Sequence, residues 1–177
     1  KSAMHIVTEI DPASDALLAR NHYNTEFSQR TAFFEVDSTT RSFTADRLDF
    51  IGRNRSLANP VALERVRLSG RIGAGLDPCA ALQVPFDLEP GQQRELVFML
   101  GMADTRRSGD VSQMVRQHRG SKAAAAALAA VQAYWQTTLG AVQVSTPDPA
   151  FDVLANGWLL YHTIACRMWA RSGYYQS

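Results

Sequence analysis

Residues 82–100 read Leu82-Gln-Val-Pro-Phe-Asp-Leu-Glu-Pro-Gly-Gln-Gln-Arg-Glu-Leu-Val-Phe-Met-Leu100, and this stretch decides the fold class. Its first half alternates apolar and polar residues from Leu82 to Leu88, which predicts a strand with one solvent-exposed face, and Pro85 predicts a sheet edge. The apolar run Leu96–Leu100 predicts a strand buried on both faces. Glu89-Pro-Gly-Gln92 between them has the composition of a turn, so we expect a β-hairpin.

Shorter apolar runs extend this β pattern toward the N-terminus. His5–Ile10 and Ala32–Val36 lie between clusters of Asp, Pro, Ser and Asn, residues that favour turns. Several short strands separated by turns predict a β-sandwich, whose two inner faces supply the hydrophobic core.

Beyond the strands the apolar residues recur every three or four positions, which is typical of helices. A short helix is predicted over Val111–His118 and ends before Gly120. Ser121 is in position to cap a second helix, for which Gly140 is the natural stop.

A third helix is predicted to begin at Asp148-Pro149, because the Asp side chain can accept from free amides and the proline needs no acceptor. Its apolar stripe is wider than a surface helix needs, which predicts packing partners on more than one side. We expect this helix to pack on the second one through Leu128, Val131 and Trp135, or to pair with another chain. The stripe consists of Phe151, Leu154, Trp158, Tyr161, Ala165 and Met168.

The composition excludes several classes of protein. The chain has 177 residues, 46% of them apolar and 20% charged, which fits one or two globular domains. A net charge of +1 provides no excess for binding nucleic acid or an anionic membrane. No apolar stretch reaches the ~20 residues of a transmembrane helix. Since the sequence starts at Lys1 without a signal-peptide pattern and stops within an aromatic segment, we expect a piece of a longer protein.

Glycines and acidic residues offer the first candidate sites. Gly70, Gly73 and Gly75 match neither GxGxxG nor the lysine-containing P-loop, so a loop between strands is favoured over a phosphate site. The available carboxylate pairs for glycoside hydrolysis are Asp46 with Asp49 and Asp148 with Asp152. Their positions favour helix capping and ion pairing with nearby arginines, so no residue is assigned as catalytic.

The side chains that bind metals are scattered. His5, His22, His118 and His162 lack HxxxH or HxH spacing, and Cys79 and Cys166 lack the spacing of a zinc site, so no metal ligand is assigned.

Several motifs, in order along nearly the whole chain, resemble the phosphorylase-like region of bacterial cyclic β-1,2-glucan synthases, a region related to cellobiose and chitobiose phosphorylases. The sequence departs from that pattern at Gly157, His162 and Gly173, where Arg, Gln and a small residue such as Ala are expected. The motifs are Tyr23-Asn-Thr-Glu-Phe27, Thr44-Ala-Asp-Arg47, Phe50-Ile-Gly-Arg53, Leu68-Ser-Gly-Arg71, Gly73-Ala-Gly-Leu-Asp-Pro-Cys-Ala-Ala-Leu-Gln83, Trp135, Thr146-Pro-Asp148, Asn156, Trp158-Leu-Leu-Tyr161, Ala165-Cys-Arg167, Trp169-Ala-Arg-Ser172 and Tyr174-Tyr-Gln176.

The resemblance implies a mainly β fold with C-terminal helices: a β-supersandwich, a helical linker and the first helix of an (α/α)6 barrel. The corresponding boundaries are residues 1–107 for the sandwich, 108–147 for the linker and 148–177 for the truncated start of the barrel.

The family likeness also implies which residues approach a substrate. Arg171, Tyr175 and Gln176 match a stretch that borders the sugar subsite, although Arg171 can equally be a cation at a helix C-terminus. The general acid and the phosphate ligands of the family follow beyond Ser177, so this chain alone is expected to be inactive.

By the same resemblance, the longer protein performs inverting phosphorolysis or chain-length control of β-glucan. Inorganic phosphate is its co-substrate and no cofactor is expected. The implied partners are a β-glucan oligosaccharide and a second copy in a homodimer, with neither nucleic acid nor membrane contact by this chain. The resemblance implies a bacterial protein associated with the inner membrane. It does not indicate whether this part of the protein lies on the cytoplasmic or the periplasmic side. The alternatives are a non-catalytic carbohydrate-binding sandwich and a purely structural or dimerisation sandwich.

Overall fold

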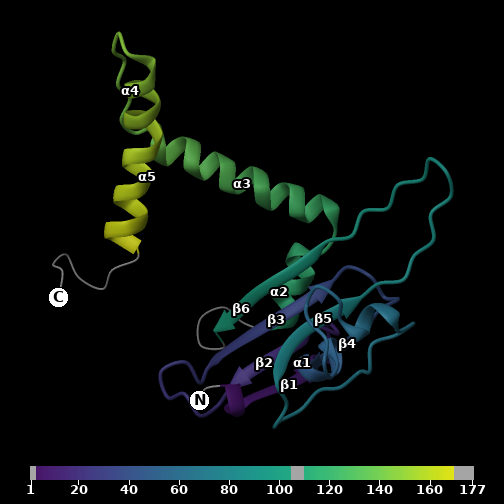
Figure 1. Ribbon diagram of the computed structural model, residues 1–177. Helices are drawn as coiled ribbons and strands as arrows, with labels where there is room; N and C mark the ends of the chain where they lie inside the picture. Colours follow the sequence, from purple (N-terminus) through teal and green to yellow (C-terminus); the bar gives the residue numbers. More distant parts are fainter. Residues whose placement is uncertain (1–2, 105–109, 170–177) are drawn as a thin grey trace. The chain divides into compact units, whose positions relative to one another are not determined.

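The structure is a computed structural model that describes residues 3–104 and 110–169 (Figure 1). The chain divides into two compact units, Lys1–Ala124 and Ala125–Ser177, which we describe separately. Strands dominate the first unit and helices make up the second. The expected mainly β class with C-terminal helices is thereby confirmed.

A four-stranded antiparallel sheet forms the centre of the first unit. Its order is β1-β2-β3-β6, and the four strands lie side by side in Figure 1. Two of them, β1 and β3, overlap the strands expected at His5–Ile10 and Ala32–Val36. The bounds are β1 Ile6–Ile10, β2 Leu17–Asn21, β3 Arg30–Val36 and β6 Phe98–Asp104.

A second sheet has two antiparallel strands, β4 and β5. Their pairing runs from Ser42 opposite Gln83 to Asp46 opposite Pro78, with a shift of register between Thr44 and Asp46. Two short helices lie between these strands in the sequence, and a third precedes β1. The bounds are η1 Ala3–His5, β4 Ser42–Asp46, α1 Arg47–Ile51, η2 Val61–Glu64 and β5 Pro78–Gln83.

The expected hairpin within residues 82–100 is wrong. β5 ends at Gln83 and pairs with β4, whereas β6 begins at Phe98 and pairs with β3 in the other sheet. The turn between them does form, since Gln92 N donates to Glu89 O at 2.9 Å and Gly91 has a positive φ of 83°. The connection therefore carries the chain from one sheet to the other.

Two strand assignments change with that hairpin. Leu82 and Gln83 end β5, and the alternating residues after them are not strand, because Pro85 cannot donate to a ladder. The run at Leu96–Leu100 is not buried on both faces: Leu100 is 80% exposed, while Ala103 on the same strand is buried. β6 thus behaves as an edge strand with one covered face.

The hydrophobic core cluster lies between the four-stranded sheet and α2, which spans Val111–His118, and not between the inner faces of two sheets as expected from the sequence. Asp110 caps the helix by accepting from Ser112 N. Val111 and Val115 are one turn apart and pack with Leu18 and Phe33 of the sheet. At ~1.5–3 kcal/mol for each large side chain fully buried, these contacts attach the helix to the sheet.

A buried carboxylate joins the same helix to the strands. Glu35 of β3 is fully buried, and its Oε1 lies 3.3 Å from Arg41 Nη1 and 3.1 Å from Arg119 Nη2. Its Oε2 has no hydrogen-bond partner in the described part of the chain. Burial raises the pKa of Glu35, and the two arginines only partly oppose that shift.

The second helix, α3, spans Ser121–Leu139. Its start differs by one residue from the expectation: Ala124 N donates to Gly120 O at 3.0 Å, so Gly120 rather than Ser121 precedes the first turn. Gly140 stops the helix as expected, and its amide donates to Gln136 O at 2.9 Å.

The third helix runs from Pro149 to Trp169 and starts as expected, since Asp148 accepts from Ala150 N. Two π-helical stretches interrupt it. Its segments are α4 Pro149–Val153, the π-helical η3 Leu154–Trp158, α5 Leu159–Thr163 and the π-helical η4 Ile164–Trp169.

Aromatic rings join this helix to α3 within the second unit. The ring of Trp135 lies 5.0 Å from Tyr161 and 5.5 Å from Trp169 between centroids, so the expected packing on α3 is confirmed for Trp135. It is not confirmed for Leu128 and Val131, which are 59% and 54% exposed. A search of the described residues finds no helix long and apolar enough for a membrane span.

The first prediction concerns Gly101, which lies opposite Phe33 in the register of β6 and β3. A Cβ at this position would lie 2.5 Å from Phe33 Cζ, and the ring has little freedom because it is buried under α2. We expect Gly101→Ala to lower the free energy of unfolding by about 1–3 kcal/mol, measured by denaturant titration. The matched control is Gly157→Ala, whose Cβ would meet no atom within 4 Å. Equal stability of the two variants would contradict this packing.

Candidate functional site

The residues expected at the sugar subsite cannot be placed. Arg171, Tyr175 and Gln176 lie outside the described residues, which end at Trp169. The remaining candidates from the sequence include the carboxylates that could act as acid and base.

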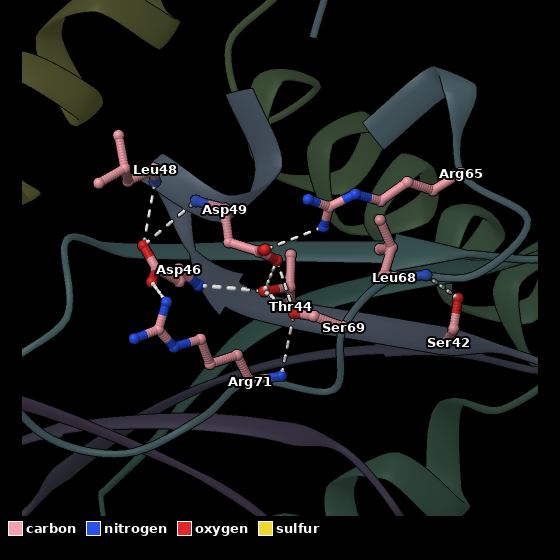
Figure 2. Close-up of polar contacts among 9 residues, drawn as sticks. All are labelled: Ser42, Thr44, Asp46, Leu48, Asp49, Arg65, Leu68, Ser69 and Arg71. Atoms are coloured by element: carbon pink, nitrogen blue, oxygen red, sulfur yellow. Dashed lines mark hydrogen bonds and ion pairs between the residues drawn. The ribbon is translucent and has the colours of Figure 1, made fainter. Parts of the chain in front are cut away.

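Asp46 and Asp49 lie at the junction of β4 and α1 (Figure 2). Asp46 ends the strand and caps the helix: its Oδ1 accepts from Leu48 N at 3.0 Å, and its Oδ2 lies 2.8 Å from Arg71 Nη1. The carboxylate is almost fully buried. Both of its oxygens are thus occupied by contacts within the fold.

Asp49, one turn further, is more heavily engaged (Figure 2). Its Oδ1 accepts from Arg65 Nη1 at 2.9 Å, and its Oδ2 accepts from Ser69 Oγ at 2.5 Å and Thr44 Oγ1 at 3.2 Å. Burial alone would raise the pKa of Asp49, but these hydrogen bonds and the charge of Arg65 lower it below its usual value.

This geometry does not suit general acid catalysis. A general acid needs a pKa near the working pH and an open oxygen within reach of substrate, whereas Asp49 is held ionised and both of its oxygens accept protein donors. The expectation of capping and ion pairing is confirmed for Asp46 and Asp49. The pairing arginines are Arg65 and Arg71, not the nearer Arg47, Arg53 and Arg55.

The hydrogen bonds and ion pairs of Asp46 and Asp49, here called the carboxylate network, hold the segment 65–73 between the two sheets. This segment belongs to no strand. On one side Gly70 N donates to Phe43 O and Ala45 N donates to Arg71 O, both at 2.8 Å. On the other side Thr8 N donates to Gly73 O at 3.1 Å. The segment thereby links β4 with β1.

The three glycines of this region form a loop, as expected. Gly70, Gly73 and Gly75 have positive φ values of 72°, 131° and 72°, and they lie between η2 and β5. Gly73 N donates to Thr8 Oγ1 at 3.0 Å, so this amide is used within the fold. These contacts are those of a loop that connects strands, as predicted.

Sequence reasoning missed Arg65, Ser69 and Arg71 as partners of the two carboxylates. In the sequence, Leu68-Ser-Gly-Arg71 was noted only as one of the motifs that carry the family resemblance. Its spacing from Asp46 and Asp49 along the chain carries no information about contact, because a segment without regular structure can approach from any direction.

The second carboxylate pair is also structural. Asp148 caps the third helix, and Asp152 accepts from Thr146 N at 2.9 Å and from Thr146 Oγ1 at 2.9 Å. These contacts fasten the chain just before the helix to its first turn. The expected capping role is confirmed for Asp148.

The thiol of Cys79 and the metal-binding residue types provide no alternative chemistry. Burial raises the pKa of Cys79 to about 11, which keeps the thiol protonated and a poor nucleophile at neutral pH. Within residues 3–104 and 110–169, no group of three or more His, Cys, Asp or Glu side chains could hold a metal ion.

Two antiparallel sheets are followed in the chain by helices, and the carboxylates at the sheet and helix ends are used for structure. Comparison with protein families agrees: residues 1–121 match "Glycosyl hydrolase 94, supersandwich domain" and residues 134–177 match "Glycosyl hydrolase 94 superfamily, catalytic domain". The chain belongs to the glycosyl hydrolase 94 family. It contains supersandwich sequence followed by sequence of the catalytic domain.

Individual relatives agree with the family. The chain is 35% identical over 178 residues, 100% of its length, to the cyclic beta-(1,2)-glucan synthase NdvB of Rhizobium meliloti. It is 27% identical over 150 residues, 85% of its length, to an N,N'-diacetylchitobiose phosphorylase of Vibrio proteolyticus. The matched part is 6% of the first relative and 18% of the second. The resemblance read from the motifs is confirmed.

The second prediction concerns Asp49→Asn. Because the pKa of Asp49 in the folded protein lies below the ordinary 3.8, its ionised form stabilises the fold at neutral pH, and that contribution is lost as the pH falls through the folded-state pKa. We expect the substitution to lower the free energy of unfolding by about 1–3 kcal/mol at pH 7 and by much less in acid. Urea titrations at several pH values measure this. The exposed Asp87→Asn is the control, and a penalty independent of pH would refute the assignment.

Proposed function

We propose that the chain is the N-terminal part of a glycoside phosphorylase-type module of a cyclic β-1,2-glucan synthase, and that the longer protein performs inverting phosphorolysis or chain-length control of β-glucan. The observation that carries the proposal is the 35% identity to a cyclic beta-(1,2)-glucan synthase across the whole chain, from the strands through the third helix. Relatives that are phosphorylases, including one of N,N'-diacetylchitobiose, support the reaction type.

In the proposed reaction, inorganic phosphate attacks the anomeric carbon while one carboxylic acid protonates the departing glycosidic oxygen. The phosphate takes the place of the base-activated water of an inverting hydrolase, so a single catalytic carboxyl suffices. None of the four carboxylates examined above has this role in the proposal. The acid and the phosphate ligands belong to catalytic-domain sequence beyond Ser177, and phosphate is a co-substrate rather than a cofactor.

In the proposal, successive ranges of the sequence form successive parts of the module. Residues 1–107 form the sandwich, 108–147 the linker, and 148–177 the first helix of an (α/α)6 barrel. Arg171, Tyr175 and Gln176 border the sugar subsite, and the longer protein works as a homodimer on a β-glucan oligosaccharide.

The third prediction tests where the chemistry lies. We expect the purified 177-residue chain, incubated with β-1,2-glucan and phosphate, to release no glucose 1-phosphate and no glucose. The longer protein under the same conditions should release glucose 1-phosphate in proportion to enzyme and phosphate. Phosphate-dependent release by the 177-residue chain alone would place the acid within these residues and overturn this part of the proposal.

The fourth prediction concerns Arg171→Lys in the longer protein. An ammonium group cannot reproduce the planar, two-pronged hydrogen bonding of a guanidinium group. We expect a strong fall in the rate of phosphorolysis with an unchanged melting temperature. Unchanged turnover and melting would instead make Arg171 a charge at the end of a helix, without a role at the subsite.

A further inference from the structure

A hollow of about 350 Å³ lies on one face of the four-stranded sheet, at the end where β2 turns into β3. It is lined from all four strands and from the β2–β3 loop. Its volume falls within the range of small-molecule sites, about 300–1,000 Å³. The hydrogen bonds and ion pairs of Asp46 and Asp49 involve none of its lining residues.

The hollow exists because of the residues that the register brings together. Ala19 pairs with Ala32, and Ala32 pairs with Met102, so two methyl groups lie side by side across the sheet. Two positions along the strands, the same face carries the large residues of the next row, including Phe34 and Leu100. A row of small side chains beside a row of large ones leaves a depression with an apolar floor.

The rim comes from the β2–β3 loop, whose asparagines fix its shape. Asn21 Oδ1 accepts from Tyr23 N at 3.2 Å, and Asn24 Oδ1 accepts from Glu26 N at 3.0 Å and Phe27 N at 3.2 Å. The carbonyl oxygens are therefore used within the loop. The amide NH2 group of each asparagine is the end that can donate to a ligand.

Phe27 and Arg30 complete the rim. The Arg30 guanidinium lies 4.3 Å from the centre of the Phe27 ring, and Phe27 remains 38% exposed. The guanidinium carbon lies over the face of the ring, and the N–H groups of Arg30 are the donors on this side of the rim. The hollow thus combines apolar surface with a few donors held in fixed positions.

We propose that this hollow is a non-catalytic binding site for a glucosyl residue of a β-glucan chain. Pyranose C–H groups fit a floor of methyl, thioether and aromatic surface, and sugar hydroxyls accept from amide and guanidinium N–H groups. Of the two arginines of the lining, Arg20 alternates with Ala19 and Asn21 along β2, so its side chain lies on the opposite face of the sheet, 3.1 Å from Glu9 Oε1, and Arg30 is the guanidinium at the rim. The choice of glucan rests on the proposed function.

The test is a titration of the whole 177-residue chain with a linear β-1,2-gluco-oligosaccharide, followed by calorimetry and by amide chemical shifts. We expect saturable binding with shifts at residues of the hollow. Ala32→Leu fills the floor and should weaken binding at least about tenfold, which corresponds to about 1.4 kcal/mol. The matched control is Ala129→Leu, an exposed alanine of α3 outside the hollow, which should bind as the unaltered chain does.

Three results would overturn the proposal: no saturable binding, equal binding by the Ala32→Leu and Ala129→Leu variants, or self-association that only Ala32→Leu removes, since the face would then be an interface between copies. If circular dichroism shows that Ala32→Leu is unfolded, Phe27→Ala replaces it with the same expected loss. Phosphorolysis by the longer protein tests the proposed function separately, because its absence alongside saturable binding would overturn only that function.

Discussion

Three carboxylates inside the first unit are each paired with an arginine from elsewhere in the chain. Glu35, Asp46 and Asp49 are all removed from solvent to a large degree, and an unpaired charge in such a place would cost several kcal/mol. Each is paired: Asp46 with Arg71, Asp49 with Arg65, and Glu35 with both Arg41 and Arg119. Because these arginines come from segments without strands of their own, the pairing decides where those segments lie.

Two parts of the architecture depend on this constraint. Arg65 and Arg71 hold the segment 65–73 against β4 and α1, and the same segment hydrogen-bonds to β1, so the two sheets share a connection besides their packing. Arg119 holds the end of α2 over β3, next to the apolar contacts of Val115. The helical part of the chain begins at that point. Ion pairing therefore helps to position the segment 65–73 and the end of α2, which strand pairing does not place.

The same constraint separates structure from chemistry. Carboxylate oxygens that accept from arginine, serine, threonine or backbone donors are not free to exchange protons with a sugar, and this applies to Asp46, Asp49 and Asp152, while Asp148 caps the third helix. In the first unit these carboxylates therefore stabilise the fold, and the family matches place supersandwich sequence before catalytic-domain sequence.

The sequence by itself determined the features that depend on a few neighbouring residues: the turn at Glu89–Gln92, the cap at Asp148 and the stop at Gly140. It also determined the family, since a series of motifs in a fixed order can be recognised from the sequence alone. Only the tertiary structure decided that β5 and β6 pair in different sheets and that Asp46 binds Arg71 rather than the adjacent Arg47. Turns and caps are made by amides within about four residues, whereas strand pairing and ion pairing join groups far apart in the chain, and for those the local pattern specifies no partner.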